Sequence, residues 1–386
     1  MYEMSLTAPK RHFKQLDNAT VWKQQKLGDI AEFNPKTTVP SEFEYVDLAS
    51  VTGITMLSHR SEKKESAPAS AQRLARQGDI FYQVVRPYQK NNYLYNLPYN
   101  NYVFSTGYAQ LRPSVDSYFL FSLLQNDRFV KLVVDRCTGS CYPTINPNVL
   151  GNIEVRVPVD INLQIKIGQL FKALDELITV QQRKLEKILL LKKAYLCEMF
   201  PTNEKNKPKR RFCGFTDVWR QRILQDVILS EHKGTAQAGM VGTKSVYLDA
   251  SYLNGGPISY VDAAIDVECD DILVLWDGSA AGTVYQGLTG ALGSTLKAYK
   301  PKESGKFLYQ FLKCNQQMIF NSYRIPNIPH VVKTFAMEFN VNIPSLDEQL
   351  KIGAFFQSLD SLIAFQQYKL EKLHNLKEAY LNEVFC

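Results

Sequence analysis

The sequence has few of the residues that build metal sites or disulfide frameworks. Its seven cysteines form no C-x-x-C pair, and its five histidines are dispersed along the chain. An odd number of scattered cysteines is typical of free thiols in a reducing compartment. No apolar run reaches the roughly 18 residues that a membrane span requires, and the polar N-terminus does not resemble a signal peptide. We therefore expect a cytoplasmic protein without a membrane span, a metal site or disulfide bonds.

Motifs for catalysis are also absent. No G-x-x-x-x-G-K-[ST] phosphate loop occurs, and the glycine-rich stretch Gly278–Gly282 contains no lysine, so we predict a turn there. The segment Asn96–Tyr99 reads N-L-P-Y, which is similar to the short loop that holds the flipped base in adenine methyltransferases. No glycine-rich cofactor turn precedes this segment, so we predict an ordinary loop. We assign no catalytic residue to this chain.

The chain is long enough for two folded domains. It has 386 residues, of which 45% are hydrophobic and 22% are charged, as in folded globular proteins. The 45 basic and 38 acidic side chains give a net charge of +7. This excess is compatible with a polyanionic partner, because a few lysine or arginine side chains on one face neutralise several phosphates. An ordinary, slightly basic protein has the same charge, so the charge alone assigns no partner.

An internal repeat organises the chain. Residues 164–200 and 349–385, which are 185 positions apart, are identical at 22 of 37 positions. Both segments are rich in good helix formers, and neither contains Gly or Pro after Gly168 and Gly353. Apolar residues recur at steps of three and four, in a narrow stripe that is typical of a coiled coil. The repeat therefore predicts two long helices, at 158–200 and 344–386.

Each predicted helix is about 55 Å long at about 1.5 Å per residue, which is longer than one domain core requires. Two independent amphipathic helices, each packed on its own domain, are one interpretation. The narrow stripes favour packing of the helices on each other, and the short linker at 201–215 favours an antiparallel pair. Gln181 and Gln366 interrupt the stripes near their middles. We predict that they approach each other and fix the register of the helices, with two solvent-facing glutamines as the alternative.

Fainter similarity extends over the remainder of each half. Trp22 and Trp219 have similar neighbours, and a predicted strand leads into each helix at Pro158 and Pro344. Short strands that alternate with few helices are typical of α+β domains. We predict an α+β fold with a pseudo-twofold internal repeat, in which two similar domains, at 1–157 and 216–343, are separated by the antiparallel coiled coil.

This organisation resembles the specificity subunit of type I restriction–modification enzymes. The resemblance rests on the W-x-x-x-x-L-x-D patterns that begin at Trp22 and Trp219, on the strands that contain G-D-I and D-D-I, and on the repeated Q-x-x-I-G helices. It covers essentially the whole chain, and the helices are its most specific part. The two intervening domains are similar to target-recognition domains, which differ widely among members of that family.

The resemblance implies a non-catalytic subunit that reads a bipartite target in double-stranded DNA. Each domain would read one half-site, and the helices would set the spacing and dock two modification (methyltransferase) subunits. These use S-adenosylmethionine to methylate adenine, and restriction subunits that translocate DNA with ATP and Mg²⁺ complete the enzyme. No cofactor is implied on this chain. A stand-alone, two-headed DNA-binding regulator and a helical scaffold protein are the alternatives, and specific binding by the chain alone would favour the regulator.

Polar loops after predicted strands are the candidate DNA-binding sites. Base edges are read by Arg, Lys, Asn, Gln, Ser and Thr, and phosphates are contacted by the same residues and by Tyr. The candidates in the first domain are Arg86, Tyr88, Gln89, Lys90, Asn91, Asn92, Ser140, Tyr142, Thr144 and Asn146. Those in the second domain are Trp276, Asp277, Ser279, Thr283, Asn321, Tyr323, Arg324, Asn327 and His330. Each residue has an ordinary solvated loop as its alternative, so the clusters are stronger predictions than their members. Because the loops differ between the domains, we expect an asymmetric target.

Overall fold

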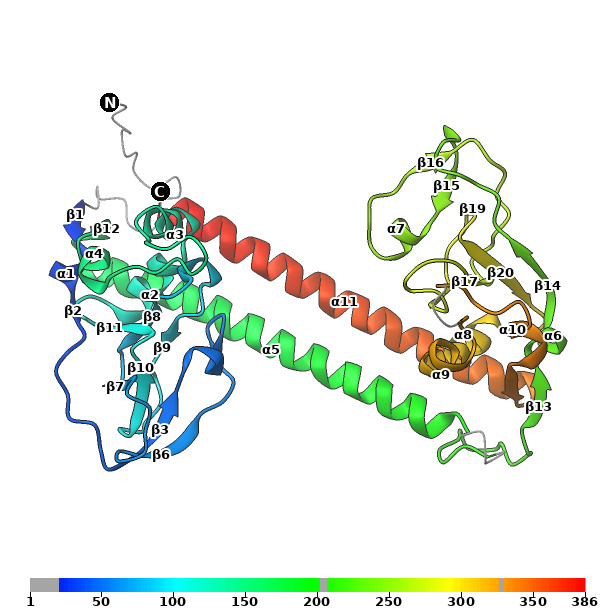
Figure 1. The fold of residues 1–386 in the computed structure, drawn as a ribbon, viewed down its shortest axis with the longest axis horizontal. Coiled ribbons are helices and arrows are strands. Elements are labelled where there is room, and N and C mark those ends of the chain that lie inside the picture. The colour runs from blue at the N-terminus through cyan, green and yellow to red at the C-terminus, as the bar shows by residue number, and fades with distance from the viewer. Residues whose placement is uncertain (1–20, 202–206, 326–328, 386) are drawn as a thin grey trace. The chain divides into compact units, whose positions relative to one another are not determined.

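The computed structural model describes residues 21–201, 207–325 and 329–385 and divides the chain into two compact units (Figure 1). Unit 1 contains residues 1–182 and 368–386, and unit 2 contains residues 183–367. Two helices of 39 residues each, α5 (Ile161–Met199) and α11 (Leu346–Val384), contribute one part to each unit. At about 1.5 Å per residue each helix is about 58 Å long, as the repeat predicted.

Unit 1 contains two four-stranded sheets and two strand pairs. One sheet has the order β2-β11-β8-β9, with β2 (Ala31–Phe33), β8 (Ile80–Gln83), β9 (Tyr93–Leu94) and β11 (Tyr108–Pro113). The other has the order β6-β3-β10-β7, with β3 (Glu42–Val46), β6 (Arg60–Lys63), β7 (Ala71–Leu74) and β10 (Tyr102–Ser105). The strand pairs are β1 (Trp22–Lys26) with β12 (Glu154–Pro158) and β4 (Val51–Thr52) with β5 (Thr55–Met56). The short helices are α1 (Leu27–Ile30), η1 (Leu48–Ser50), η2 (Pro87–Gln89), α2 (Ser117–Gln125), α3 (Asp127–Val134) and α4 (Pro147–Gly151).

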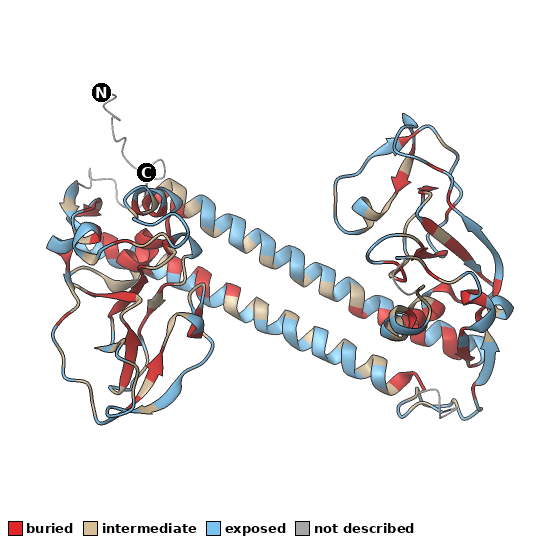
Figure 2. Cartoon of the chain, in the orientation of Figure 1, coloured by how far each residue is buried: buried red, intermediate tan, exposed pale blue. Residues whose placement is uncertain are grey.

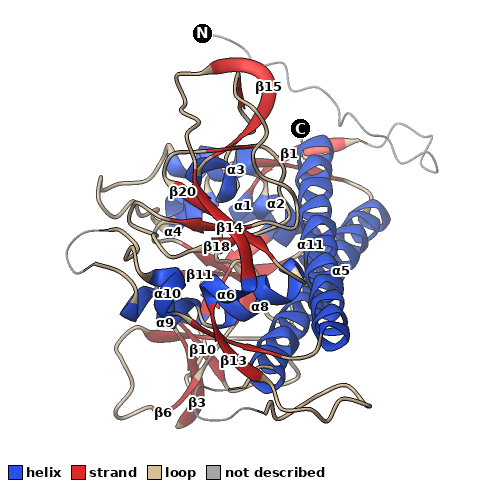
Figure 3. Cartoon of the chain, turned by 90° about the vertical axis from the view of Figure 1, so that its right-hand side faces the viewer, coloured by secondary structure: helices blue, strands red, loops and turns tan. Residues whose placement is uncertain are grey.

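Unit 2, which faces the viewer in Figure 3, repeats this plan with fewer strands among the described residues. Its larger sheet has the order β14-β20-β17-β18, with β14 (Ile228–Lys233), β17 (Ile272–Leu275), β18 (Val284–Tyr285) and β20 (Leu296–Pro301). Its smaller sheet has the order β16-β15-β19, with β15 (Val241–Leu248), β16 (Tyr260–Val261) and β19 (Ala291–Leu292). Strands β13 (Arg220–Ile223) and β21 (Asn340–Ile343) form a pair. The short helices are α6 (Leu224–Val227), α7 (Ala250–Leu253), α8 (Gly305–Cys314), α9 (Gln316–Ser322) and α10 (Phe335–Glu338).

Each domain core is closed by the end of a long helix, where buried residues are concentrated (Figure 2). In unit 1, Phe385 follows α11 and its ring lies 5.5 Å from that of Phe119 and 5.8 Å from that of Phe171. In unit 2, Phe200 follows α5 and its ring lies 5.6 Å from that of Phe307. Phe200 and Phe385 are equivalent positions of the repeat. Full burial of a phenylalanine contributes about 1.5–3 kcal/mol. Phe200 is buried and Phe385 is half-buried, so both helix ends are attached to their domains.

The repeated Q-x-x-I-G motif attaches each domain to the start of a long helix. A Cβ on Gly168 would lie 2.3 Å from a carboxylate oxygen of Asp116, the N-cap of α2, and a Cβ on Gly353 would lie 2.9 Å from Lys306 Cβ in α8. Only a glycine therefore allows α5 to approach α2, and α11 to approach α8, this closely. The glutamine of the motif adds a hydrogen bond, because Gln164 Oε1 accepts from the backbone N–H of Asp116 at 3.1 Å.

The long helices pack against each other in antiparallel directions, which confirms the sequence prediction. In unit 1, Lys377 of α11 forms an ion pair with the buried Asp175 of α5 at 2.5 Å. In unit 2, Lys192 of α5 forms an ion pair with Asp360 of α11 at 2.5 Å. The second pair is the first one with the two helices exchanged, since 175 and 360, like 192 and 377, are 185 positions apart. The same contact therefore orients the helices in both units.

Candidate nucleic-acid interface

Two polar loops that are far apart in the sequence lie side by side in the first domain. Loop A1 (residues 84–92) follows β8, and loop B1 (residues 135–146) connects α3 to α4. The backbone N–H of Arg86 donates to the carbonyl oxygen of Pro143 at 2.7 Å. The Arg86 guanidinium carbon lies 4.4 Å from the centre of the Tyr142 ring. The two predicted clusters of the first domain thus form one continuous surface.

The second domain pairs its loops in the same way. Loop A2 (residues 276–283) follows β17, and loop B2 (described at 323–325 and 329–331) follows α9. The backbone N–H of Gly278 donates to the carbonyl oxygen of Pro329 at 2.8 Å. A β-bridge joins Asp277 to His330, as another joins Val85 to Thr144 in the first domain. Both domains therefore present the same pair of loops at the same end of the corresponding strand.

Several polar side chains of loop A1 stabilise the loop itself. Asn92 is 1% exposed, and its Oδ1 accepts from the backbone N–H of Gln83 at 2.8 Å. The side chain of Gln83 donates to Gln89 Oε1 at 2.9 Å, and Asn91 Oδ1 accepts from the backbone N–H of Gly53 at 2.8 Å. These bonds occupy groups that the sequence suggested for DNA contacts. Gln89, Asn91 and Asn92 thus contribute to the shape of the loop.

Other candidates of the first domain divide into occupied and free side chains. Asn146 caps α4, because its Oδ1 accepts from Asn148 N at 2.8 Å, and Lys90 forms an ion pair with Asp127. Thr144 pairs through its backbone with Thr138 and Val85. Tyr88, Ser140 and Tyr142 are exposed. Together with Arg86, these three exposed side chains are the candidates that remain available to a ligand.

In the second domain, packing occupies several candidates. Trp276 is buried in the core, and Tyr323 packs on Phe335 and Phe339 with ring distances of 5.3 and 5.5 Å. Two others form local hydrogen bonds, since the Asn321 side chain accepts from Gln317 and the Thr283 hydroxyl donates to the carbonyl oxygen of Ala280. Asn327 lies outside the described residues. The remaining candidates are Asp277, Ser279, Arg324 and His330.

Asp277 is the electrostatic centre of the second surface. Its Oδ1 lies 2.5 Å from His330 Nδ1, and its Oδ2 accepts from Lys233 Nζ at 2.9 Å. Burial alone would raise the pKa of Asp277, but the hydrogen bonds from His330 and Lys233 outweigh burial and hold the pKa below its usual value. A carboxylate with a lowered pKa stabilises the fold above about pH 4, and this contribution is lost as the pH falls through the folded-state pKa. Sequence reasoning missed Lys233, because it lies on β14, far from either loop in the sequence.

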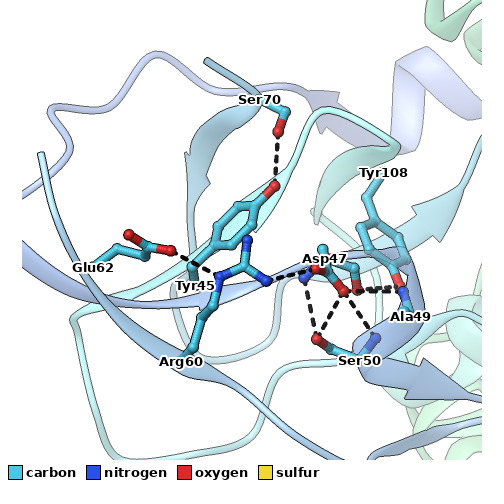
Figure 4. Close-up of polar contacts among 8 residues, drawn as sticks. All are labelled: Tyr45, Asp47, Ala49, Ser50, Arg60, Glu62, Ser70 and Tyr108. Carbon is cyan, nitrogen blue, oxygen red and sulfur yellow. Dashed lines mark hydrogen bonds and ion pairs between the residues drawn. The ribbon is translucent and has the colours of Figure 1, made fainter. Parts of the chain in front are cut away.

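A second polar cluster in unit 1 has a structural task (Figure 4). Arg60 on β6 donates to Asp47 at 2.9 Å and to Glu62 at 2.7 Å, and its guanidinium carbon lies 4.8 Å from the centre of the Tyr45 ring. Asp47 also caps η1 through the backbone N–H groups of Ala49 and Ser50. Both acidic partners neutralise Arg60, so its charge is not available to a phosphate although the side chain is exposed.

Neither a metal cluster nor a membrane span occurs in the part of the chain that the structure describes. No group of three or more His, Cys, Asp or Glu side chains is placed to hold a metal ion in residues 21–201, 207–325 and 329–385. No helix within these ranges is long and apolar enough to cross a membrane. The segment Asn96–Tyr99 forms a loop and Gly278–Gly282 forms a turn, as predicted.

The predicted register residues are partly buried in their helices. The side-chain Oε1 atoms of Gln181 in unit 1 and Gln366 in unit 2 are both buried, and neither accepts a hydrogen bond from a described residue. The approach of the two glutamines stays a prediction.

Comparison with known proteins finds similarity to one family. The model of the type I restriction modification DNA specificity domain matches residues 219–375. The chain is 30% identical over 146 residues to the type I restriction enzyme MjaVIII specificity subunit of Methanocaldococcus jannaschii, covering 36% of this chain and 34% of that protein. It is 25% identical over 201 residues to the type I restriction enzyme HindI specificity subunit of Haemophilus influenzae, covering 48% of this chain and 42% of that protein. These alignments thus span less than half of each relative.

Solved structures share the fold over nearly the whole chain. The crystal structure of a type I restriction–modification S subunit from M. genitalium has a TM-score of 0.72 at 16% identity, covering 98% of this chain and 99% of that one. A chain from a study of complex assembly and conformational transition of the type I system has a TM-score of 0.54 at 21% identity, covering 95% and 98%. The family model and the curated relatives show that parts of this chain are similar to type I restriction–modification specificity subunits, and the solved structures show that the chain shares their fold.

Proposed function

We propose that this chain is the non-catalytic subunit that gives a type I restriction–modification complex its DNA sequence specificity. The first domain reads one half of a bipartite, asymmetric target through loops A1 and B1, and the second reads the other half through loops A2 and B2. The observation that carries this proposal is the repeated pairing of loops on one backbone plan. The turns at Arg86 and Gly278 are equivalent, whereas the side chains around them differ.

The side chains of the two surfaces support the reading of different half-sites. The first surface offers Arg86 with the exposed Tyr88 and Tyr142, a set that suits contacts to bases and phosphates. The second surface offers Arg324, whose guanidinium donates to the carbonyl oxygen of Ser279 at 3.0 Å, and the Asp277–His330 pair. A carboxylate accepts hydrogen bonds from the amino group of cytosine, and arginine donates to guanine. Two different sets of donors and acceptors select two different sequences.

The long helices are the proposed spacer. Each is continuous over 39 residues, so it has no break at which the half-site spacing would change. We propose that Gln181 and Gln366 fix the register, because a polar residue in a coiled-coil seam specifies alignment at the expense of stability. Replacing both with Leu is expected to raise the melting temperature and to broaden the accepted spacing. An unchanged spacing together with a single oligomeric state would contradict the register role.

Exposed apolar side chains on the helices are the proposed docking sites for two methyltransferase subunits. In unit 2 they are Leu189, Leu190, Leu191, Leu362 and Phe365, and in unit 1 they are Leu177, Val180, Tyr368 and Leu376. Apolar patches on an otherwise polar helix surface mark sites of protein association. Each unit has one such set of exposed side chains, its helix patch, with members on both long helices. Two sets suit two copies of one partner.

The docking proposal is tested by a matched pair of substitutions in unit 2. Leu190 in the helix patch is 65% exposed, and Leu229 on β14 is 63% exposed. Leu190→Glu is expected to weaken assembly with the methyltransferase subunit by at least about tenfold, since it puts a charge into an apolar interface. Leu229→Glu makes the same change away from the helices and should leave assembly unchanged, as measured by analytical ultracentrifugation. Equal effects of the two substitutions would contradict docking at the helix patch.

Catalysis belongs to the partners in this proposal. The methyltransferase subunits bind S-adenosylmethionine and methylate adenine in each half-site, and restriction subunits use ATP and Mg²⁺ to translocate and cleave DNA. The complex acts in the cytoplasm, where its target DNA lies. This chain supplies recognition, spacing and docking surfaces.

Methylome sequencing tests the proposed function directly. Cells with the gene should carry adenine methylation in one asymmetric bipartite motif, and deletion of the gene should remove methylation of that motif alone. An unchanged methylome would refute the proposal. If the purified chain binds a specific bipartite DNA sequence without a methyltransferase, a regulator is supported instead. If neither the chain nor its complex binds DNA, a scaffold is supported.

A further inference from the structure

The turn at the start of loop A1 has an arginine where the second domain has a glycine. Arg86 has φ 53° and ψ 55°, and Gly278, its equivalent, has φ 112°. Both N–H groups donate to a proline carbonyl, at 2.7 Å to Pro143 and at 2.8 Å to Pro329. Positive φ is freely accessible to glycine and strained for other residues. The second domain shows that this turn forms with glycine, so the turn itself does not require the arginine.

The surrounding residues hold Arg86 in this strained conformation. Pro87 follows it at the start of η2, and the Gln83 side chain links to Gln89 and Asn91 around the same loop. Lys90 closes η2 with a second positive φ of 54°. Strained non-glycine residues persist only where the surroundings fix them, and they are concentrated at functional sites. The loop therefore holds the Arg86 side chain at a defined position.

The guanidinium of Arg86 is oriented and remains available to a ligand. Among the described residues its side chain has one partner, the ring of Tyr142 at 4.4 Å. Stacking on an aromatic ring fixes the plane of a guanidinium but leaves the N–H groups at its edge free. Arg60, which is also stacked on a tyrosine, differs in donating to two carboxylates. Arg86 therefore presents a fixed fork of donors to which no described residue supplies an acceptor.

We propose that Arg86 is a specificity-determining residue that reads a guanine in the first half-site. A planar guanidinium donates two parallel hydrogen bonds to O6 and N7 of guanine in the major groove, the commonest specific contact of arginine. Tyr142 orients the guanidinium, and the strained turn places it at the edge of the surface. The inference deepens the proposed function and rests on it.

The test uses the complex of the full chain with its methyltransferase subunit and a DNA library randomised over both half-sites. Arg86→Gly places the residue of the second domain at the same turn, so the fold should keep or raise its melting temperature. Preference for guanine at one position of the first half-site should fall roughly 5- to 150-fold, while every other position keeps its preference. Arg86→Lys retains the charge but not the planar fork, and should also lose this preference.

Lys90→Gly is the matched control. It relieves the same kind of backbone strain and removes one positive charge from the same loop. The Lys90 ammonium is already paired with Asp127, so the sequence preference at every position should persist. Tyr142→Leu, which removes the stacking partner, should weaken the guanine preference without abolishing it.

Four outcomes would overturn the inference. If Arg86→Gly weakens binding to all sequences by the same factor, Arg86 contacts a phosphate and not a base. If the base preference is unchanged at all positions, Arg86 does not contact DNA. Loss of preference for a base other than guanine would refute the assigned base. A wild-type complex without any sequence preference would refute the proposed function, and the inference with it.

Discussion

The buried ion pair between Arg211 and Glu348 yields the sharpest stability prediction. Arg211 lies in the connector after α5 and Glu348 in the first turn of α11, both in unit 2. The guanidinium donates to both carboxylate oxygens, at 2.8 and 2.6 Å, and also to the carbonyl oxygen of Asp217 at 2.8 Å. Glu348 is 1% exposed. The pair attaches the connector to the helix that closes the second domain.

The magnitude follows from the burial of the carboxylate. Arg211→Ala leaves Glu348 buried without its countercharge, and loss of one partner of such a pair costs about 3–5 kcal/mol. The repeat provides the compensating change, because the position equivalent to Glu348 is the buried Leu163. The double variant Arg211→Met with Glu348→Leu leaves no buried charge. We expect its stability to lie within about 1 kcal/mol of the wild type or above it.

Tryptophan fluorescence during thermal unfolding measures this effect. Trp219 and Trp276, two of the three tryptophans, are buried in unit 2 and report on its unfolding. For a unit of this size about 1 kcal/mol corresponds to about 2–4 °C, so Arg211→Ala should lower the melting temperature by about 6–20 °C. A loss below about 2 °C would refute the importance of the pair. A double variant as unstable as Arg211→Ala would show that the loss does not come from the unpaired charge.

Three further predictions concern single side chains. Gly168→Ala forces a methyl group against α2 and should destabilise unit 1 by about 1–3 kcal/mol in calorimetry, whereas Gly239→Ala, with no atom within 4 Å of the new Cβ, should have little effect. In the complex, DNA should slow alkylation of the exposed Cys141 in loop B1 several-fold but not that of the exposed Cys269, and equal rates by mass spectrometry would contradict a DNA-facing loop. Asp277→Ala removes a negative charge from the second surface. It should steepen the slope of log K against log salt by up to about 0.9 while lowering specificity, and an unchanged slope in anisotropy titrations would argue against a DNA-facing carboxylate.

The long helices and the two-domain order were predictable because the repeated packing constrains both copies. Asp175, Lys192, Asp360 and Lys377 form the same ion pair twice, and Gly168 with Gly353 allows the same close approach, so these positions tolerate few residues. Their identity across the repeat is visible in the sequence without any structure. The α+β class followed from the short strands between the helices.

The roles of individual loop residues were not predictable, because they depend on contacts between distant segments. Asn92 and Tyr88 are both polar loop residues in the sequence. In the structure Asn92 is buried and accepts a hydrogen bond from a backbone N–H, whereas Tyr88 is 51% exposed. Asn146 caps a helix whose first turn begins with Pro147, and this signal was present in the sequence. Nothing in the sequence indicates that Lys233 reaches Asp277, since 44 residues separate them.

The two copies of the repeat are most similar in the long helices and least similar in the paired loops. The helices are identical at 22 of 37 positions, whereas the paired loops share backbone contacts, with hydrogen bonds to Pro143 in one domain and to Pro329 in the other. A turn that accepts glycine at position 278 gains nothing in stability from arginine at position 86, because positive φ costs a non-glycine residue about 1–2 kcal/mol. An arginine that is present at position 86 despite this cost in stability is most simply explained by a contact between its side chain and a molecule outside the folded chain. The sites where the two copies share backbone geometry but differ in side chains are therefore where the reading of two different half-sites is expected.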